Sequence, residues 1–305
     1  MRVATLQKEE IVIALQTFLS RCSISYRKMP MDKAFLALCF DEATKRGYMI
    51  DGPDPLRPFI PQGVCIAMTS YTHLEDKSAY VWLALYTACG IYCDDVFRKD
   101  TEAVALFCER LMRNQPQQDR ALNAFAELIL EISHHFPRVT SNIMVTSTLN
   151  ALNALLIEDQ TKGLPVSVYA DNYPAFSRIM SGASEVYALA MFPPEVPVGS
   201  YIQALPSLMI YIMNVNDILS FYKEELAEET VNHISLIASA RGCSPRDAFQ
   251  SLIDETVEAH QKITHILEPD PKALDAYRKF AAGFVYFYTT LDSRYHLNEL
   301  GFGSD

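Results

Sequence analysis

Apolar residues recur every three or four positions along almost the whole chain, which is the periodicity of amphipathic helices. This pattern predicts about eleven helices, at residues 6–21, 31–47, 75–96, 101–114, 117–135, 138–160, 171–191, 199–225, 231–240, 245–267 and 271–298. Helix-breaking segments separate several of them, at residues 51–63, 162–165, 192–199, 241–245 and 268–271. Period-two runs bounded by tight-turn dipeptides are nearly absent. The chain is therefore predicted to be all-α, with helices packed on one another.

Several of these helices are apolar on most faces, so each should be surrounded by other helices. The run at 79–93 is the longest, yet it is short for a membrane span and two aspartates follow it. We expect a helical bundle around an apolar pocket, with no stable membrane insertion. Residues 1–305 should form a single domain, because no part of the chain looks separable.

Charge and cysteine content exclude several classes of protein. The net charge is −11 and basic residues do not cluster, which argues against nucleic-acid binding. The seven cysteines are scattered singly on apolar segments, which is typical of reduced core residues in a cytoplasmic protein. The first residues carry charges and lack the apolar core of a secretory signal.

A ladder of oxygen-bearing side chains ends the apolar helix predicted at 199–225. Asn216, Ser220 and Glu224 are four residues apart, so they share one helix face. Amide, hydroxyl and carboxylate oxygens are hard ligands that suit Mg²⁺. The alternative interpretation is a solvated helix end whose polar residues have no chemical role.

A second acidic feature follows the apolar run. Asp94 and Asp95 close the predicted helix 75–96, and two adjacent carboxylates near an apolar end need a counter-charge. A divalent metal or a nearby arginine supplies one. A frayed helix end pointing into water is the alternative.

Taken together, the two features resemble the class I terpene cyclases, and in particular the fungal trichodiene-synthase-like sesquiterpene cyclases. NDILSFYKE (216–224) is similar to the second metal motif of that family at every ligand position, and the Asp pair lies about 120 residues upstream. LDSRYHL (291–297) resembles the C-terminal Arg-Tyr signature, and YPAFSRIMSG (173–182) the segment with the diphosphate-sensing arginine. The resemblance runs from about residue 70 to the C-terminus, and residues 1–70 carry no recognised motif.

The resemblance implies roles for individual residues in an all-α class I terpenoid synthase fold. It gives the metal ligands as Asp94, Asp95, Asn216, Ser220 and Glu224, with three Mg²⁺ ions when diphosphate is bound. Asp95 would also pair with Arg294 when the site closes. The substrate-binding residues would be Arg178, Lys223, Arg294 and Tyr295, with Tyr288 in the pocket wall.

Some positions depart from the family pattern or have a simpler explanation. Arg98 stands where an acid is commoner, and Asp100 is the next acid along the chain. Ser293 and His296 replace additional arginines. His233, His260 and His265 are expected to be surface or hydrogen-bonded residues, and Trp82 a packing residue.

The function implied is Mg²⁺-dependent ionisation of farnesyl diphosphate and cyclisation of the resulting carbocation to a C15 hydrocarbon or alcohol. The 16 Phe and 16 Tyr are enough to line a pocket that shields such a cation. Residues 225–231 should order only on ligand binding, and the resemblance allows a homodimer. Two alternatives stay open: a chain-elongating isoprenyl diphosphate synthase, which needs a second Asp-rich motif not found here, and a non-catalytic helical scaffold.

Overall fold

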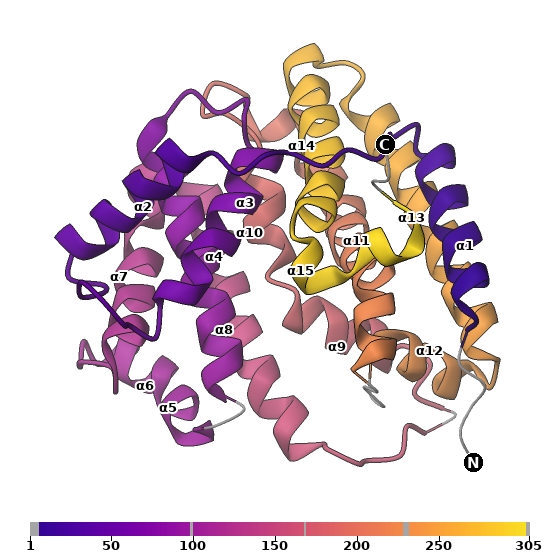
Figure 1. Cartoon of the computed structure of the whole chain (residues 1–305), viewed down its shortest axis with the longest axis horizontal. Helices are drawn as coiled ribbons and strands as arrows, with labels where there is room; N and C mark the ends of the chain where they lie inside the picture. The colour runs from indigo at the N-terminus through magenta and orange to yellow at the C-terminus, as the bar shows by residue number, and fades with distance from the viewer. Residues whose placement is uncertain (1–5, 98–99, 168, 228–231, 303–305) are drawn as a thin grey trace. The chain divides into compact units, whose positions relative to one another are not determined.

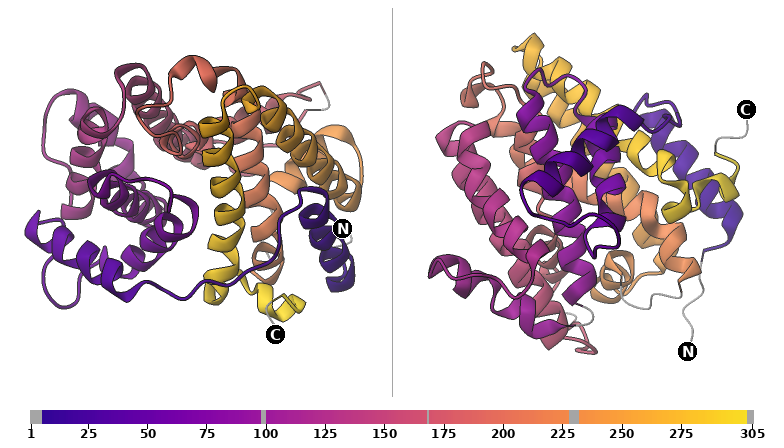
Figure 2. Two further views of the ribbon diagram at one scale, coloured as in Figure 1. Left: turned by 90° about the horizontal axis from the view of Figure 1, so that it is seen from above. Right: turned by 60° about the vertical axis from the view of Figure 1, so that its left-hand side comes forward.

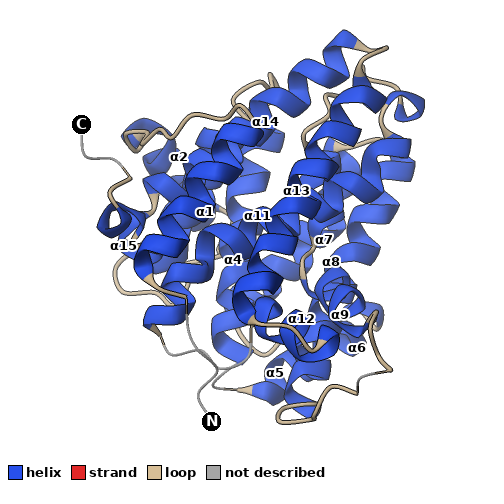
Figure 3. Ribbon diagram, turned by 90° about the vertical axis from the view of Figure 1, so that its right-hand side faces the viewer, coloured by secondary structure: helices blue, strands red, loops and turns tan. Residues whose placement is uncertain are grey.

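Capping residues and helical periodicity together set where the helices begin and end. The computed structural model describes residues 6–97, 100–167, 169–227 and 232–302. α8 (Arg138–Gln160) and α13 (Pro245–Leu267) have the predicted bounds, and α13 begins where the Ser244 hydroxyl accepts the Asp247 N–H. Within the described ranges, Figure 3 shows only helices and loops. The all-α prediction is confirmed.

The helices fall into two groups, one for each predicted metal motif. The first-motif group (residues 30–162) holds α2 (Lys33–Lys45), η1 (Arg57–Phe59), α3 (Ile60–Ser70), α4 (Lys77–Phe97), α5 (Thr101–Ala105), α6 (Phe107–Met112), α7 (Arg120–His135) and α8. The second-motif group (residues 1–29 and 163–305) holds α1 (Lys8–Arg21), α9 (Tyr173–Ser181), α10 (Ser184–Ala190), η2 (Val198–Ser200), η3 (Ile202–Ala204), α11 (Leu205–Leu226), α12 (His233–Arg241), α13, α14 (Pro271–Thr290), α15 (Asp292–Tyr295) and η4 (Leu297–Leu300).

α11 is the central helix of the second-motif group. It packs against α10 and α13, and α1 lies against both α11 and α13 (Figures 1 and 2). The segment Ile202–Leu226 is long and apolar enough to cross a membrane, but 72% of its apolar 18-residue window is buried inside the protein. Its apolar surface is therefore that of a core helix, in agreement with the expectation of no membrane insertion.

α4 is the central helix of the first-motif group, where it packs against α3 and α7. Trp82 on α4 is fully buried, and its indole N–H donates to the Leu128 carbonyl of α7 at 2.9 Å. This confirms its packing role. All seven cysteines lie in the described residues as thiols rather than disulfides, and five of them are buried.

One helix was missed because it begins with residues that usually break helices. The segment 51–63 was predicted to be a breaker, yet α3 starts at Ile60 and contains Pro61 and Gly63. Proline is compatible with a first helical turn, where its missing N–H has no helical partner. A Cβ on Gly63 would lie only 1.9 Å from the Ala84 carbonyl oxygen. Glycine therefore permits the close packing of α3 on α4.

Four predicted helices are interrupted. Segment 101–114 divides into α5 and α6, and 171–191 divides into α9 and α10. Segment 199–225 begins as the 3-10 turns η2 and η3, and its α-helix α11 starts only at Leu205. The segment 271–298 ends its long helix at Thr290 and continues as α15 and η4. Periodicity continues across these breaks because both sides still bury apolar residues, so it does not locate them.

Candidate active site

A break in the chain after α9 brings Arg178 against α11. The chain passes through Gly182 and then Ala183, whose φ of 43° lies in the left-handed region. A Cβ on Gly182 would lie 2.9 Å from Cγ of Met213 on α11. The glycine thus lets the end of α9 approach α11 closely, one turn after Arg178.

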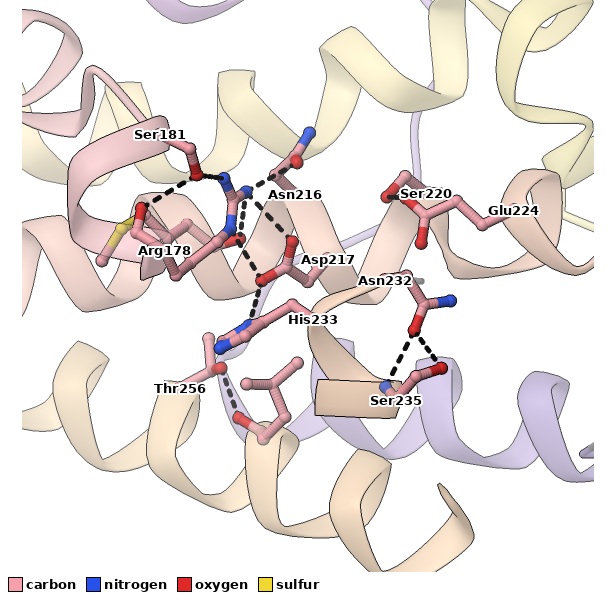
Figure 4. A network of polar contacts seen from close by, with 12 residues as sticks. Arg178, Ser181, Asn216, Asp217, Ser220, Glu224, Asn232, His233, Ser235 and Thr256 are labelled. Carbon is pink, nitrogen blue, oxygen red and sulfur yellow. Dashed lines mark hydrogen bonds and ion pairs between the residues drawn. The ribbon is translucent and has the colours of Figure 1, made fainter. Parts of the chain in front are cut away.

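The Arg178 side chain, which is only 16% exposed, lies across two consecutive residues of α11. Nε donates to Oδ2 of Asp217 at 3.0 Å, and Nη2 lies 3.0 Å from Oδ1. Nη2 also donates to the amide oxygen of Asn216 at 2.8 Å. A two-pronged contact with a carboxylate fixes the guanidinium plane, and Figure 4 shows Asp217 and Asn216 both facing it.

Asp217 is held from its other side by His233, the first residue of α12. Nδ1 of His233 lies 2.7 Å from Oδ2 of Asp217, and each side chain is 10% exposed. Since an ionised carboxylate only accepts hydrogen bonds, Nδ1 is the donor. Burial favours a raised pKa for Asp217, but Arg178 and His233 outweigh it and lower the pKa below its usual value.

The sequence alone gave Asp217 no role and described His233 as a surface or hydrogen-bonded residue. His233 is indeed hydrogen-bonded, but within the candidate site. These contacts join residues 16 and 39 positions apart, so no local pattern contains them. Asp217 directly follows a predicted ligand on an apolar helix. An acid in such a position is the one sequence signal that points to a role for Asp217.

Two members of the predicted oxygen ladder on α11 contact each other. The Ser220 hydroxyl donates to Oε1 of Glu224 at 2.6 Å, which shows that the two side chains share a face. The Asn216 amide nitrogen donates to the Tyr288 hydroxyl of α14 at 2.9 Å. Tyr288 is buried, so it orients the Asn216 amide in addition to any part in a pocket wall.

The C-terminal residues reach this network through aromatic contacts. The buried Tyr295 ring lies 4.7 Å from the ring of Tyr288, and the Arg294 guanidinium lies 5.8 Å from the Tyr295 ring centre. Lys223 is half-buried in the last turns of α11. Arg178, Asn216, Tyr288 and Tyr295 thus form one connected cluster in the second-motif group.

Asp94 and Asp95 are half-buried in the last turn of α4, in the first-motif group. Asp100 has a structural role, since its carboxylate accepts the Ala103 N–H and caps α5. Arg98 lies outside the described residues, as do residues 228–231 of the segment expected to order on ligand binding. The meeting of the two motifs stays a prediction.

The residues of the ladder fit a magnesium ion by their chemistry. Ser220 and Glu224 supply hydroxyl and carboxylate oxygens that already lie 2.6 Å apart. The Asn216 oxygen accepts one bond from Arg178, and a carbonyl oxygen has a second lone pair. Hard oxygen donors of this kind suit a small divalent cation that keeps some of its water.

A cavity of about 430 Å³ in the first-motif group is a different kind of site. Its lining is mostly polar and includes none of the predicted site residues: Arg46, Gly47, Tyr48, Gln118, Asp119, Arg120, Asn123, Ala124 and Glu127. It is therefore not the apolar pocket expected from the sequence.

Comparison with known proteins identifies the family to which these motifs belong. A family model described as trichodiene synthase (TRI5) matches residues 33–302. An alpha-cuprenene synthase, COP6, of Coprinopsis cinerea is 35% identical over 96% of this chain and 90% of its own. Monoterpene synthase 25 of Postia placenta is 33% identical over 80% of this chain and 74% of its own.

Solved structures of terpene synthases share the fold at low sequence identity. The Streptomyces clavuligerus linalool/nerolidol synthase, in complex with 2-fluorogeranyl diphosphate, has a TM-score of 0.61 at 16% identity, over 92% of this chain and 97% of its own. The germacradien-4-ol synthase of Streptomyces citricolor has a TM-score of 0.62 at 17% identity, over 87% and 96%. The fold is thus that of the class I terpenoid synthases.

Proposed function

This chain belongs to the trichodiene synthase (TRI5) family and is a terpene synthase, and we propose that it is a Mg²⁺-dependent sesquiterpene cyclase. Its substrate would be farnesyl diphosphate, converted to a cyclic C15 hydrocarbon or alcohol with release of diphosphate. The observation that carries the proposal is the 2.8 Å contact between Arg178 and Asn216. It puts a largely buried cation directly beside the first oxygen of the candidate magnesium ladder.

The proposed site has two sides. Asn216, Ser220 and Glu224 would hold one Mg²⁺ ion, and Asp94 with Asp95 the others, three in all with diphosphate bound. Bound Mg²⁺ would neutralise charge that builds on the diphosphate as its C–O bond breaks. Neither group of helices carries the whole ligand set. We therefore propose that residues 1–305 work as one catalytic domain.

Hydrogen-bond donors of the chain itself would hold the diphosphate. Arg178, Lys223, Arg294 and Tyr295 are the residues we assign to it. Arg178 always carries its charge, and a guanidinium matches phosphate oxygens with paired N–H donors. Asp95 would pair with Arg294 as the site closes.

Aromatic rings would stabilise the carbocation that remains after diphosphate leaves. Phe284, Phe287, Tyr288 and Tyr295 form a contiguous cluster, with neighbouring ring centres 4.7–6.4 Å apart. A ring face beside a cation contributes about 0.5–2 kcal/mol, the larger values applying away from water. Burial, and to a smaller extent the nearby Tyr295, raises the pKa of Tyr288 well above its usual value. The phenol therefore stays neutral.

Two chain lengths are candidates for the substrate, C15 and C10. The relative with alpha-cuprenene synthase activity is similar over nearly the whole of both chains and favours a C15 substrate. The relative named as a monoterpene synthase, with 33% identity, favours geranyl diphosphate as the second candidate. We propose farnesyl diphosphate because the first similarity is the more extensive.

Incubation of the purified chain with Mg²⁺ and each diphosphate, followed by gas chromatography and mass spectrometry, tests the proposal. A volatile cyclic C15 product from farnesyl diphosphate, abolished by EDTA, is expected. A product from geranyl diphosphate alone would shift the assignment to C10. Longer diphosphates would indicate chain elongation, and no conversion at all would contradict the proposal.

The cysteine content and the family bear on where the protein resides and on its oligomeric state. Seven cysteines without disulfides in the described residues fit a reducing compartment, so we expect a cytoplasmic protein. A homodimer is compatible with the family, and light scattering of the purified chain at several concentrations would detect it.

A further inference from the structure

His233, Asp217 and Arg178 form a largely buried chain of contacts that ends at a candidate metal ligand. His233 donates to Asp217 at 2.7 Å, Asp217 holds Arg178 through both carboxylate oxygens, and Arg178 donates to Asn216 at 2.8 Å. Figure 4 shows Asp217 between the imidazole and the guanidinium. His233 contacts Asp217 at 2.7 Å, and Asp217 links it through Arg178 to Asn216 of the ladder.

The arrangement uses one edge of the guanidinium and leaves the other for a ligand. Nε and Nη2 are engaged by Asp217 and Asn216, and Nη2 also lies 3.3 Å from the Met213 carbonyl. Nη1 carries two hydrogens, and within the described residues its contact is a long one to the Ser181 hydroxyl, at 3.4 Å. Nη1 is therefore the atom we expect to donate to diphosphate.

The position of His233 is itself fixed by the start of α12. The Asn232 side chain accepts the Ser235 N–H at 2.9 Å and the Ser235 hydroxyl at 2.8 Å, which caps the helix. α12 packs against α13 and against α9, the helix that carries Arg178. His233 therefore joins the segment after the second metal motif to the arginine-bearing helix.

The orientation of a buried carboxylate is fixed by the hydrogen-bond donors around it. Oδ2 of Asp217 receives both Nε of Arg178 and Nδ1 of His233. Loss of the imidazole donor would leave Oδ2 held by Arg178 alone, in a site that water enters poorly. The carboxylate could then rotate, and the guanidinium edge would rotate with it.

We propose that His233 is a positioning residue for diphosphate binding, which acts through Asp217 to aim Nη1 of Arg178 at the leaving group. This inference rests on the proposed function, because it assumes that Arg178 binds the diphosphate. It assigns a part in the site to a residue that lies outside all of the recognised motifs.

The test compares two substitutions of nearly the same shape. In His233→Asn the amide nitrogen takes the place of Nδ1 and still donates to Asp217, whereas His233→Leu removes the donor. His233→Phe is a second variant without the donor that fills the space of the ring. The readout is the dissociation constant for inorganic pyrophosphate with Mg²⁺, measured by calorimetry on the full chain. Circular dichroism establishes that each variant is folded.

We expect His233→Leu and His233→Phe to weaken pyrophosphate binding about tenfold, as loss of an outer hydrogen-bond partner commonly does. His233→Asn should stay within about threefold of the unmodified chain. The exposed His265, replaced by Asn, is the matched control and should change nothing. With farnesyl diphosphate, the variants without a donor should show a lower kcat/KM and the same product.

The outcomes separate this inference from the proposed function. If the unmodified chain binds pyrophosphate and folded His233→Leu and His233→Phe bind it equally well, the positioning role is wrong and the proposed function stands. If His233→Asn is as weak as the variants without a donor, the loss comes from packing and the inference also fails. If the unmodified chain neither binds pyrophosphate nor converts farnesyl diphosphate, the proposed function itself fails.

Discussion

Nη2 of Arg178 lies 2.8 Å from the amide oxygen of Asn216, although the two residues are 38 positions apart and belong to different helices. The break at Gly182 permits this approach, and Asp217 and Tyr288 hold the two partners in place. A permanently charged donor and a candidate metal ligand thus share one hydrogen bond. The arrangement suits a ligand that needs both a metal ion and an arginine, and diphosphate is such a ligand.

Replacement of Arg178 by Lys should lower kcat/KM for farnesyl diphosphate by about 10²–10³, the usual cost of losing a well-placed donor to developing negative charge. Lysine keeps the positive charge but lacks the planar fork that engages Asp217 and Asn216. Steady-state kinetics would measure this loss. Arg113→Lys, on an exposed surface residue paired with Glu109, is the control and should keep full activity. Equal activity of the two variants would argue against a role for the fork.

Ser220→Ala should raise the Mg²⁺ concentration needed for half-maximal activity by about tenfold, since one oxygen ligand is lost. A titration of activity with Mg²⁺ at saturating substrate measures this. Ser207→Ala, more than three turns earlier on the same helix, controls for removal of a hydroxyl from α11. An unchanged magnesium requirement in Ser220→Ala would remove Ser220 from the ligand set.

Gly63→Ala should destabilise the protein by about 1–3 kcal/mol, the usual range for overpacking a core. Its Cβ would lie 1.9 Å from the backbone oxygen of Ala84, which cannot move without shifting α4. Gly90→Ala on α4 is the matched control, because the nearest atom to its Cβ is 3.9 Å away. That variant should be neutral or gain up to about 1 kcal/mol of helix propensity. Urea unfolding of both variants measures the difference.

The stability of the protein should fall as pH drops below neutrality, in part through His260. Burial lowers the pKa of His260, and Arg278 adds to this, while its Nδ1 lies 2.7 Å from the Tyr277 hydroxyl. Because the pKa is lower in the folded state than its usual value near 6.5, the unfolded chain takes up the proton first. The contribution of neutral His260 to stability is fully present above the pKa that it has in the unfolded chain. It is lost as pH falls through the lower pKa that it has in the folded protein.

Urea unfolding between pH 7.5 and 5 measures this dependence. His260→Asn removes the titrating group and should flatten the curve, although His135, whose pKa burial also lowers, keeps part of the slope. The exposed His265→Asn should leave the curve unchanged. A slope in His260→Asn equal to that of the unmodified chain would contradict this assignment.

Much of the fold follows from the sequence, since helices such as α8 and α13 show continuous periodicity between clear breakers. The sequence pattern does not predict α3, because Pro61 and Gly63 are typical of loops. Their helical role depends on the backbone of α4, which no local pattern contains. The ladder of Asn216, Ser220 and Glu224 was predictable because four-residue spacing fixes one face. The contacts of Asp217 with Arg178 and His233 were not, because tertiary packing creates them.

The central claim is that Asp94 and the ladder of Asn216, Ser220 and Glu224 bind one metal-bound diphosphate together. A crystal structure with Mn²⁺ and pyrophosphate tests it most directly, because Mn²⁺ takes the oxygen ligands of Mg²⁺ and is located by its anomalous scattering. We expect manganese ions at the Asp94 carboxylate and at the ladder, with the pyrophosphate bridging them and Nη1 of Arg178 donating to it. Manganese confined to one motif, with pyrophosphate absent from the other, would contradict the account.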